Sequence, residues 1–315
     1  MRRASLRALA KINLTLEVLH KRPDGYHEVR TVLQTVSAPA DRLIVSYEPH
    51  KQTEIVVEGM PEVPAEANLA WRAAEALLRC GEQSGRVRIE IDKRIPTGAG
   101  LGGGSADAAA VLLALPCLMG FKVGFSQLLE IAAQLGSDVP FFLLGGTVAA
   151  TGRGTELFPL PDGVRGGVSI VAPPVAVSTA QAYQALERPL TGRWGSNTLG
   201  SFRSLTAILG AGARSEEWLS LCRNDFEDVV FGGHSELKAI KTQLEREGAQ
   251  LAQLTGSGSA IYGLWLGKDK PAELPDQQCF RGRLVSRRRY QLLWWKQLQR
   301  HAVRGTWPPL SRYAQ

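Results

Sequence analysis

Cysteine clusters and long apolar runs are what this chain lacks. Its four cysteines and five histidines are scattered over 315 residues, without the spacing of a zinc site or a disulfide framework. No run of about 18 apolar residues occurs, so we expect no transmembrane helix. The basic first residues lead into a strand-like segment with Lys11 rather than into the apolar core of a secretory signal. We therefore expect a protein of the reducing cytoplasm.

Acidic residues are absent from residue 281 onward, where eight arginines and one lysine lie. The net charge of the chain is +7, so subtracting these nine cations leaves about −2 for residues 1–280. The basic character belongs to a tail, residues 286–315, which also holds Trp294, Trp295 and Trp307. Such a tail can contact RNA or a membrane surface, or it can be an element docked on the body and followed by a solvated end. Because the body is nearly neutral, we expect no nucleic acid and no membrane partner.

Glycine is concentrated in residues 96–106, with the sequence Pro-Thr-Gly-Ala-Gly-Leu-Gly-Gly-Gly-Ser-Ala. Residues 87–92 alternate apolar and polar side chains, as a half-buried strand does, and a helix of small residues opens at Ser105 or Ala106. Five glycines in seven residues let backbone N–H groups approach an anion closely. The helix N-terminus adds a partial positive charge. The segment predicts a cradle for a polyphosphate.

Two well-known phosphate-binding motifs do not fit this segment. No Lys-Ser or Lys-Thr follows the last glycine, so it is not a P-loop. The string G-x-G-x-x-G occurs at residues 98–103, but the strand that would carry a dinucleotide site does not open the chain, and no repeated βαβ pattern surrounds it. A flexible linker is the plainer alternative, but two strongly patterned elements do not usually flank a linker.

Periodicity predicts a strand-rich first half and a mixed second half, which together form an α+β fold. In the first half we expect strands at residues 8–19, 29–36 and 148–151, a hairpin of 43–47 with 53–58, and helices at 68–80 and 125–135. In the second half we expect strands at 168–172 and 260–266, helices at 180–186 and 235–247, and a loop over the glycine- and serine-rich residues 191–212. Glycine and proline at 156–166 mark a boundary, so the expected domains are 1–157 and 158–285, followed by the tail.

Several ordered segments resemble one enzyme superfamily, the GHMP kinases. Residues 100–106, Gly-Leu-Gly-Gly-Gly-Ser-Ala, resemble its phosphate-binding motif, and residues 254–260 resemble its third motif. Three further segments are similar to signatures of the 4-diphosphocytidyl-2-C-methyl-D-erythritol kinases: Ala-Lys-Ile-Asn at 10–13, Pro-Asp-Gly-Tyr-His at 23–27 and Gly-Ser-Asp-Val-Pro at 136–140. The resemblance is collinear from about residue 8 to about residue 265.

This resemblance implies a two-domain fold and a reaction. The N-terminal domain would be ribosomal-protein-like and bind ATP, and the C-terminal domain would be ferredoxin-like. The reaction would be ATP-dependent phosphorylation of the 2-hydroxyl of 4-diphosphocytidyl-2-C-methyl-D-erythritol, a step of the non-mevalonate isoprenoid pathway.

The resemblance implies a catalytic pair, Lys11 and Asp138. Phosphoryl transfer to an alcohol needs a carboxylate that aligns or deprotonates the hydroxyl, and a neighbouring lysine stabilises that carboxylate and the nascent alkoxide. Each residue also has a plainer interpretation. Lys11 could be a solvated strand residue, and Asp138 could be the N-cap of the next helical turn.

For ATP the resemblance implies eleven positions: Pro96, Gly98, Gly100, Leu101, Gly102, Gly103, Gly104, Ser105, Ala106, Asn68 and Lys93. Mg²⁺ is expected with ATP because the charge on its phosphates needs a divalent ion. No carboxylate cluster identifies the ligands of that ion, although Ser105 is a candidate contributor.

For the alcohol substrate the resemblance implies five positions: Asn13, Tyr26, His27, Thr179 and Tyr183. Tyr26 and Tyr183 would stack on the two faces of the cytosine ring, while His27 supplies hydrogen bonds. Tyr183 could equally be a core residue. Leu33 stands where some family members have an aromatic residue near the substrate, which weakens that wall of the pocket.

Other functions stay open at this point. A homoserine or mevalonate kinase would share the phosphate loop but not the block at 23–27. A catalytically silent ligand sensor would not need both Lys11 and Asp138. An RNA-binding protein could use the ribosomal-protein-like fold and the tail, but the body is not basic. We expect a cytoplasmic enzyme that is a monomer or a weak homodimer.

Overall fold

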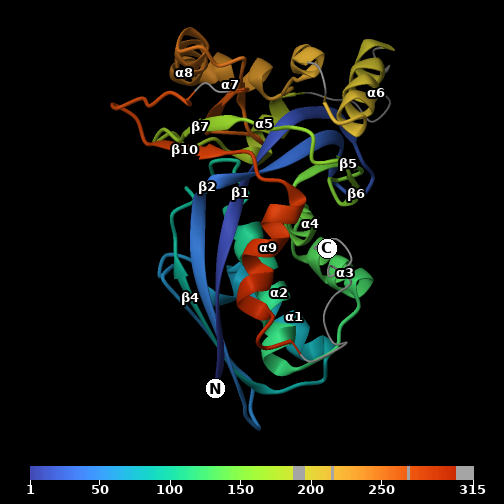
Figure 1. Ribbon diagram of the computed structural model, residues 1–315, viewed down its shortest axis with the longest axis vertical. Coiled ribbons are helices and arrows are strands. Elements are labelled where there is room, and N and C mark those ends of the chain that lie inside the picture. The colour runs from blue at the N-terminus through green and yellow to red at the C-terminus, as the bar shows by residue number, and fades with distance from the viewer. Residues whose placement is uncertain (187–195, 214–215, 268–269, 303–315) are drawn as a thin grey trace.

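The computed structural model describes residues 1–186, 196–213, 216–267 and 270–302. These residues form two β-sheets, each covered by helices, which follow one another along the long axis of the molecule (Figure 1). This is the two-sheet α+β architecture expected from the sequence. Within the described ranges, no helix combines the length and the apolar character needed to cross a bilayer.

Two long strands organise the larger sheet. β1 (Arg2–Lys21) pairs antiparallel with β2 (His27–Pro49) along nearly its whole length, and in Figure 1 the pair reaches from the lower half of the molecule to the smaller sheet. The order of the other strands around β2 is β3-β4-β2-β5-β6. Their bounds are β3 (Glu54–Glu58), β4 (Gly85–Asp92), β5 (Thr147–Thr151) and β6 (Glu156–Pro159).

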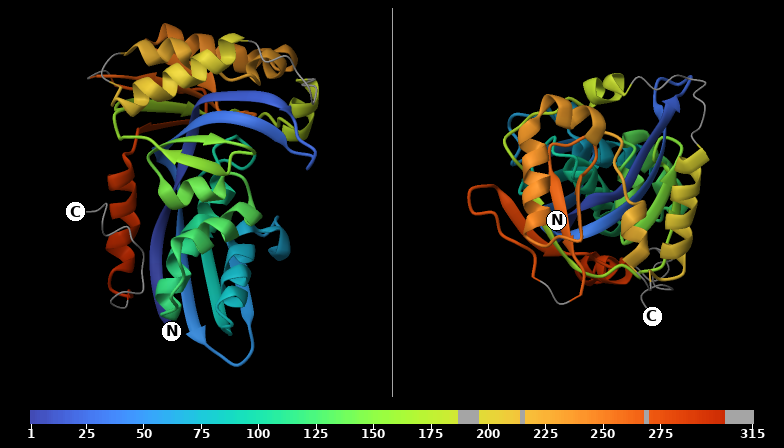
Figure 2. Two further views of the ribbon diagram at one scale, coloured as in Figure 1. Left: turned by 90° about the vertical axis from the view of Figure 1, so that its right-hand side faces the viewer. Right: turned by 90° about the horizontal axis from the view of Figure 1, so that it is seen from above.

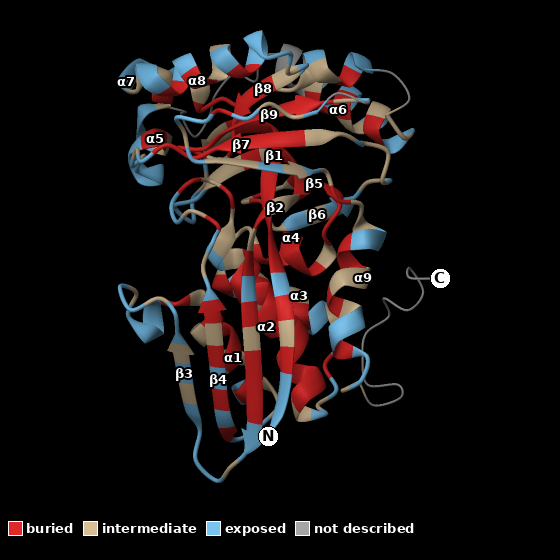
Figure 3. Ribbon diagram, turned by 60° about the vertical axis from the view of Figure 1, so that its left-hand side comes forward, coloured by how far each residue is buried: buried red, intermediate tan, exposed pale blue. Residues whose placement is uncertain are grey.

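A buried helix forms the centre of this half. α2 (Gly103–Met119) is rich in alanine and leucine, and its residues 106–118 are all buried (Figure 3). Around it lie α1 (Leu69–Cys80), α3 (Phe125–Leu135) and α4 (Val139–Leu144). α9 (Arg287–Leu298) joins the same core through buried Tyr290, Trp294 and Leu298, so this part of the tail is docked on the body. Trp307 lies outside the described residues.

The smaller sheet has the order β10-β7-β9-β8. Its strands are β7 (Gly167–Val171), β8 (Leu251–Leu254), β9 (Ile261–Trp265) and β10 (Cys279–Arg283). The helices of this half are α5 (Thr179–Ala185), α6 (Ser196–Gly210), α7 (Glu227–Gly233) and α8 (Ser235–Arg246). Short 3₁₀ turns stand at Ala65–Ala67 and Glu216–Leu221.

The expected hairpin of residues 43–47 with 53–58 is wrong. β3 pairs in parallel with β4, and β4 lies between β3 and β2. Parallel neighbours need a crossover, which α1 provides between β3 and β4. The sequence pattern identified the strands but not their partners, because alternation of side chains is the same in both pairings.

The expected loop over residues 191–212 is also wrong where the structure describes it. Residues 191–195 lie outside the described part, but α6 covers Ser196–Gly210. Phe202, Leu205 and Leu209 recur at helical spacing and are buried in the core beside the smaller sheet. Burial of this apolar stripe outweighs the low helix propensity of the glycine and serine residues.

The expected domain boundary after residue 157 falls inside β6, which still pairs with β5. The chain leaves the larger sheet after Pro159 and enters the smaller one at Gly167.

Candidate active site

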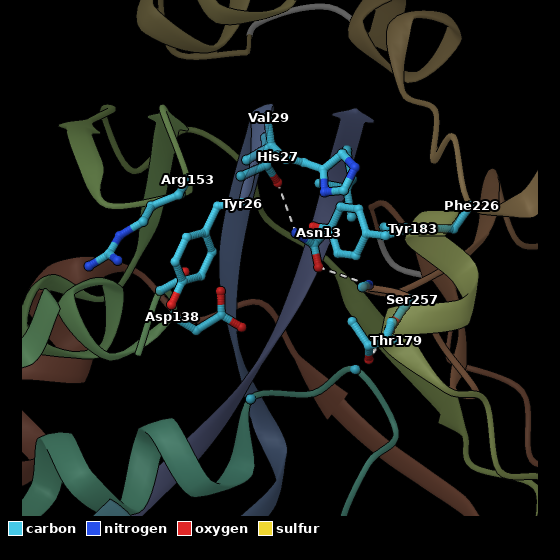
Figure 4. A pocket seen from close by; sticks show the side chains of 18 of the residues that line it. Asn13, Tyr26, His27, Val29, Asp138, Arg153, Thr179, Tyr183, Phe226 and Ser257 are labelled. Atoms are coloured by element: carbon cyan, nitrogen blue, oxygen red, sulfur yellow. Dashed lines mark hydrogen bonds between the residues drawn. The ribbon is translucent and has the colours of Figure 1, made fainter. Parts of the chain in front are cut away.

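A cavity of about 580 Å³ lies where β1, β2 and the glycine loop meet the smaller half of the molecule. Its lining includes both predicted catalytic residues, all five predicted substrate residues, and Gly100, Gly102 and Ser105 of the loop. These residues come from segments more than 240 residues apart in the chain, as with Asn13 and Ser257 (Figure 4). The fold therefore brings together most of the site expected from the sequence.

Lys11 and Asp138 form an ion pair on the wall of this cavity. Lys11 Nζ lies 3.4 Å from Asp138 Oδ2. The side chain of Lys11 is 4 % exposed, so it is not a solvated strand residue. Asp138 stands at the N-cap position of α4 but makes no side-chain capping bond there. Its side chain is 36 % exposed, and the residue lines the cavity. The carboxylate of Asp138 therefore does not serve as a helix cap, and the residue borders the space that a substrate would fill.

Asn13 holds this part of β1 against residues 254–260, which we call the third glycine motif. Its Oδ1 accepts hydrogen bonds from Lys11 Nζ at 2.7 Å and from the Gly256 N–H at 2.9 Å. Its Nδ2 donates to Thr31 Oγ1 at 2.8 Å, and its backbone N–H donates to Thr255 Oγ1 at 3.2 Å. Asn13 lines the cavity, but its polar atoms are committed to these partners. Its geometry fits a residue that orients Lys11 and the glycine motif.

An aromatic cluster forms the opposite end of the cavity. The rings of His27 and Tyr183 stack at a centroid distance of 4.5 Å, and Phe226 packs edge-on against Tyr183. Tyr26 is 51 % exposed and lies under the guanidinium of Arg153, 5.0 Å from its ring centroid. His27 covers the face of Tyr183, so the expected stacking of a cytosine between Tyr26 and Tyr183 would require the His27 ring to move aside.

Burial sets the charge states at this end. Burial lowers the pKa of His27, and the electrostatic effect of nearby Lys21 and His20 lowers it further, which favours the uncharged imidazole. Burial and the negative charge of Asp138 raise the pKa of Tyr183 to about 12, so its phenol stays protonated. The aromatic end of the cavity thus offers uncharged rings. Leu33, by contrast, is buried in the core of the larger sheet and lines neither this cavity nor the next.

The glycine loop lines a second cavity of about 270 Å³, which shares Gly100, Gly102 and Ser105 with the first. Met60 and Leu69 form an apolar side of it. The N-terminus of α2 opens here, and Ala106 N–H makes its first backbone bond, to Gly102 O at 2.9 Å. The N–H groups of residues 103–105 precede that bond, which is the arrangement of an anion-binding helix terminus.

Backbone conformation explains the glycine at position 100. Its φ is +77°, and a Cβ there would lie 2.0 Å from the carbonyl oxygen of Thr255. The loop therefore packs directly on the third glycine motif. Lys11 N–H also donates to Leu101 O at 3.1 Å, which fastens the catalytic strand to the loop. Pro96, Gly98, Gly103 and Gly104 line the second cavity, whereas Ala106 is buried in the core.

Two predicted ATP residues have structural partners. Lys93 lines the second cavity, but its Nζ lies 2.5 Å from Asp41 Oδ2 and 2.9 Å from Asp107 Oδ2, both of which are buried. Burial lowers the pKa of Lys93, but the two aspartates more than reverse this and raise it above its usual range. Asn68 lines neither cavity. Its Oδ1 accepts from Ala70 N–H at 2.9 Å and caps α1.

Several lining residues were missing from the predicted site. The hydroxyl groups of Ser257 and Thr179 share a hydrogen bond, with 2.7 Å between their oxygens. Ser257 belongs to the third glycine motif, so the motif was the sequence signal that could have pointed to it. Lys21 and Arg153 add two cations to the lining. Arg153 stands between two glycines in a tight turn, a signal that the sequence carried without pointing to a ligand. In the described part of the chain, no group of three or more histidine, cysteine or acidic residues is arranged to hold a metal ion.

Comparison with known proteins identifies the family. Residues 68–146 match the model of the GHMP kinases N terminal domain. The chain is 48 % identical to 4-diphosphocytidyl-2-C-methyl-D-erythritol kinase of Solibacter usitatus, over 99 % of this chain and 98 % of that protein. It is 42 % identical to the kinase of the same name from a Synechococcus strain, over 89 % of this chain and 90 % of that protein.

A solved structure agrees with these relatives. The crystal structure of a 4-(cytidine 5'-diphospho)-2C-methyl-D-erythritol kinase superposes with a TM-score of 0.70 at 37 % identity, covering 90 % of this chain and 99 % of its own. The expected GHMP fold and ATP-dependent kinase class are thereby confirmed. The chain belongs to the 4-diphosphocytidyl-2-C-methyl-D-erythritol kinases of the GHMP superfamily.

Proposed function

We propose that this chain transfers the γ-phosphoryl group of ATP to the 2-hydroxyl of 4-diphosphocytidyl-2-C-methyl-D-erythritol, a step of the non-mevalonate isoprenoid pathway. The single observation that carries the proposal is the shared lining of the two cavities. The second cavity, lined by the glycine loop and called the loop cavity from here on, meets the larger cavity at Gly100, Gly102 and Ser105, beside the Lys11–Asp138 pair. A phosphate bound at the loop would therefore reach a hydroxyl held at Asp138.

In this reaction Asp138 accepts the proton of the substrate hydroxyl as its oxygen attacks the γ-phosphorus, and ADP leaves. The buried ammonium of Lys11 pairs with the Asp138 carboxylate and stabilises negative charge on the attacking oxygen. Asn13 and the backbone bond to Leu101 fix Lys11 in this position.

The nucleotide occupies the loop cavity in this proposal, with its phosphates on the loop glycines and the N-terminus of α2. Met60 and Leu69 offer an apolar surface for the base. Lys93 and Asn68 act on ATP indirectly: Lys93 ties β4 to α2 through Asp107, and Asn68 fixes the start of α1.

Mg²⁺ is proposed as the companion of ATP. Such an ion takes most of its ligands from phosphate and water, so a protein cage is not required. The residues present fit that mode, since the hydroxyl of Ser105 lines both cavities where the phosphates would meet the substrate. When bound, the ion would neutralise charge on the β- and γ-phosphates.

The substrate occupies the larger cavity, with its cytosine at the aromatic end, where His27 stacks on Tyr183. Tyr26 lines the part of the cavity beside Arg153. An incoming cytosine replaces the His27 ring on Tyr183. Lys21 and Arg153 supply positive charge for the diphosphate, and Thr179 with Ser257 supplies hydroxyl groups. We further propose two domains, which meet between Pro159 and Gly167 and of which the first binds ATP. We also propose a cytoplasmic monomer or weak homodimer without a nucleic-acid partner.

An ATP-consumption assay tests the proposal. Purified protein is supplied with 4-diphosphocytidyl-2-C-methyl-D-erythritol, homoserine or mevalonate in parallel, and product formation is followed by mass spectrometry. Turnover of the cytidyl substrate alone is expected. Efficient turnover of homoserine or mevalonate without the cytidyl compound would overturn the assignment of the substrate but not of the kinase class.

A further inference from the structure

The helix that begins after Asp138 is held at its far end by another part of the chain. α4 has only six residues, and its last carbonyl groups have no partner within the helix. Side chains of α9, more than 140 residues further along, donate hydrogen bonds to two of these carbonyls, those of Phe142 and Leu144. In Figure 2 α9 stands as a separate helix along the side of the larger half.

Two side chains of α9 bind the last turn of α4. Tyr290 Oη donates to Phe142 O at 2.5 Å, and Gln291 Nε2 donates to Leu144 O at 3.3 Å. Tyr290 is 5 % exposed and Gln291 2 % exposed, so solvent does not compete for these carbonyls. Breaking such a bond leaves a buried acceptor without its partner, which destabilises this end of α4.

Arg287 extends this contact beyond α4. Its guanidinium donates to Gly145 O at 3.3 Å, to Thr147 O at 2.8 Å and to Leu160 O at 3.0 Å. Its backbone N–H donates to Asp162 Oδ1 at 2.7 Å. One side chain thus joins the end of α4 to β5 and to the residue that follows β6.

Glycine makes the close approach of the two segments possible. Gly145 has φ +67°, and a Cβ there would lie 2.1 Å from Tyr290 Cδ1. Gly146 has φ +75°, and a Cβ there would lie 2.7 Å from the backbone nitrogen of Arg287. Each position needs glycine both for its backbone conformation and for space.

α9 itself is fixed on the core. Trp294 and Leu298 follow Tyr290 at helical spacing, and both are buried against the larger half of the molecule. Ser286 caps the helix by accepting from Arg289 N–H. The side chains that bind α4 are therefore carried by an anchored element.

We infer that α9 positions Asp138 by fixing the C-terminal end of α4, an inference that rests on the proposed function of Asp138 as proton acceptor. Six helical residues span only about 9 Å, so a displacement at Leu144 is passed to Asp138. A misplacement of about 1 Å can slow a reaction about 10²-fold. Arg287, Tyr290 and Gln291 line neither cavity. They are positioning residues.

The test compares Tyr290→Phe with Arg289→Gln. Tyr290→Phe removes the hydroxyl that binds Phe142 O and keeps the ring that packs on Gly145. Arg289 is an exposed neighbour on the same turn and serves as the matched control. We expect Tyr290→Phe to lower kcat about tenfold while KM for ATP and for the cytidyl substrate stays within about twofold, since positioning acts on the chemical step. A melting temperature that falls with kcat unchanged would overturn the inference.

A double-mutant cycle asks whether Tyr290 acts through Asp138. In an Asp138→Asn background the carboxylate is already absent, so adding Tyr290→Phe should lower kcat by less than about twofold. A further tenfold loss in that background would show that Tyr290 acts by another route and would overturn the inference.

Amide hydrogen exchange gives a readout that needs no substrate. Residues 138–145 should exchange faster in Tyr290→Phe than in the wild type and in Arg289→Gln. Unchanged exchange in Tyr290→Phe would overturn the inference even if the wild-type enzyme phosphorylated a different alcohol. Absence of cytidyl-substrate turnover in the wild type would instead count against the proposed function alone.

Discussion

The ammonium of Lys11 lies 2.7 Å from the side-chain oxygen of Asn13, two residues along the same strand. Consecutive side chains of a regular strand alternate between faces, so residues 11 and 13 share one face. The same Asn13 oxygen also accepts from Gly256 N–H, so the amide couples the catalytic lysine to the third glycine motif.

Replacing Asn13 by Ala should therefore damage both activity and stability. Lys11 loses an oxygen partner and Gly256 N–H loses its acceptor, at a cost of about 1–3 kcal/mol for the buried group. We expect kcat to fall by about one to two orders of magnitude and the melting temperature to fall with it. Steady-state kinetics and thermal unfolding measure these effects. Wild-type kcat in a folded Asn13→Ala protein would contradict the orienting role.

Replacing Asp138 by Asn should separate binding from chemistry. The amide keeps the size of the side chain but cannot accept the proton, so we expect kcat to fall about 10²–10⁴-fold, as is usual when a general base is lost. ATP and substrate affinity, measured by calorimetry, should stay close to wild type. A variant that keeps more than half of the wild-type kcat would rule out Asp138 as the base.

Glu17 should make stability depend on pH. This carboxylate on β1 is buried, and among the described residues neither of its oxygens has a hydrogen-bond partner. Burial raises its pKa from 4.5 to about 7, although Arg223 opposes the shift. The folded state therefore binds more protons than the unfolded state between these values, so Glu17 lowers stability as the pH rises from about 4.5 to about 7.

Glu17→Gln should remove this dependence. The variant should be more stable than wild type at pH 8 and closer to it at pH 5, in denaturant titrations at both values. Arg30→Gln serves as the comparison, because it neutralises the cross-strand neighbour of Glu17 and leaves the carboxylate in place. If the stability difference between Glu17→Gln and wild type were the same at both pH values, the raised pKa would be refuted.

Tyr183 should govern the cytidyl end of the substrate. Stacking on an aromatic ring contributes about 1–3 kcal/mol per base in nucleic-acid binders. Tyr183→Ala should therefore raise KM for the cytidyl substrate about tenfold or more while ATP affinity hardly changes. Methylerythritol phosphate without the cytidine portion should be a very poor substrate of the wild type, because remote binding energy positions the hydroxyl. Comparable turnover of the truncated alcohol would show that the cavity has another ligand.

Local features of the sequence predicted local structure well. The helix expected at residues 125–135 is α3, with the same bounds, and the helix expected at 68–80 is α1 apart from its cap. The glycine segment lies between a strand and a helix as expected. These predictions succeeded because side-chain periodicity and glycine content report directly on backbone conformation and burial.

Relationships between distant segments could not be read in the same way. The partner of β3, the hydrogen bonds of Asn13 and the stacking of His27 on Tyr183 depend on where the fold places each segment. Lys93 illustrates the difference, because its position beside the loop was expected while its two carboxylate partners come from β2 and α2. Pattern alone does not say which buried charges will meet.

The pairing of β1 with β2 runs from one end of the larger half into the smaller half, and this limits how the enzyme can close on its ligands. A hinge between the two halves would have to bend the β1–β2 ladder at Lys11 and Asn13. The register of the ladder shifts on either side of these residues, and their N–H groups donate to Leu101 O and Thr255 Oγ1 rather than to β2, so bending there would break the contacts of the strand with both glycine motifs. The turn at residues 22–26, which carries Tyr26, lies outside that ladder. Exchange rates measured with and without nucleotide and substrate should change at this turn and not along the strands. Closure in this kinase would then be a movement of the turn at residues 22–26 over the paired strands β1 and β2. Lys11, which lies on β1, and its partner Asp138 would keep their positions.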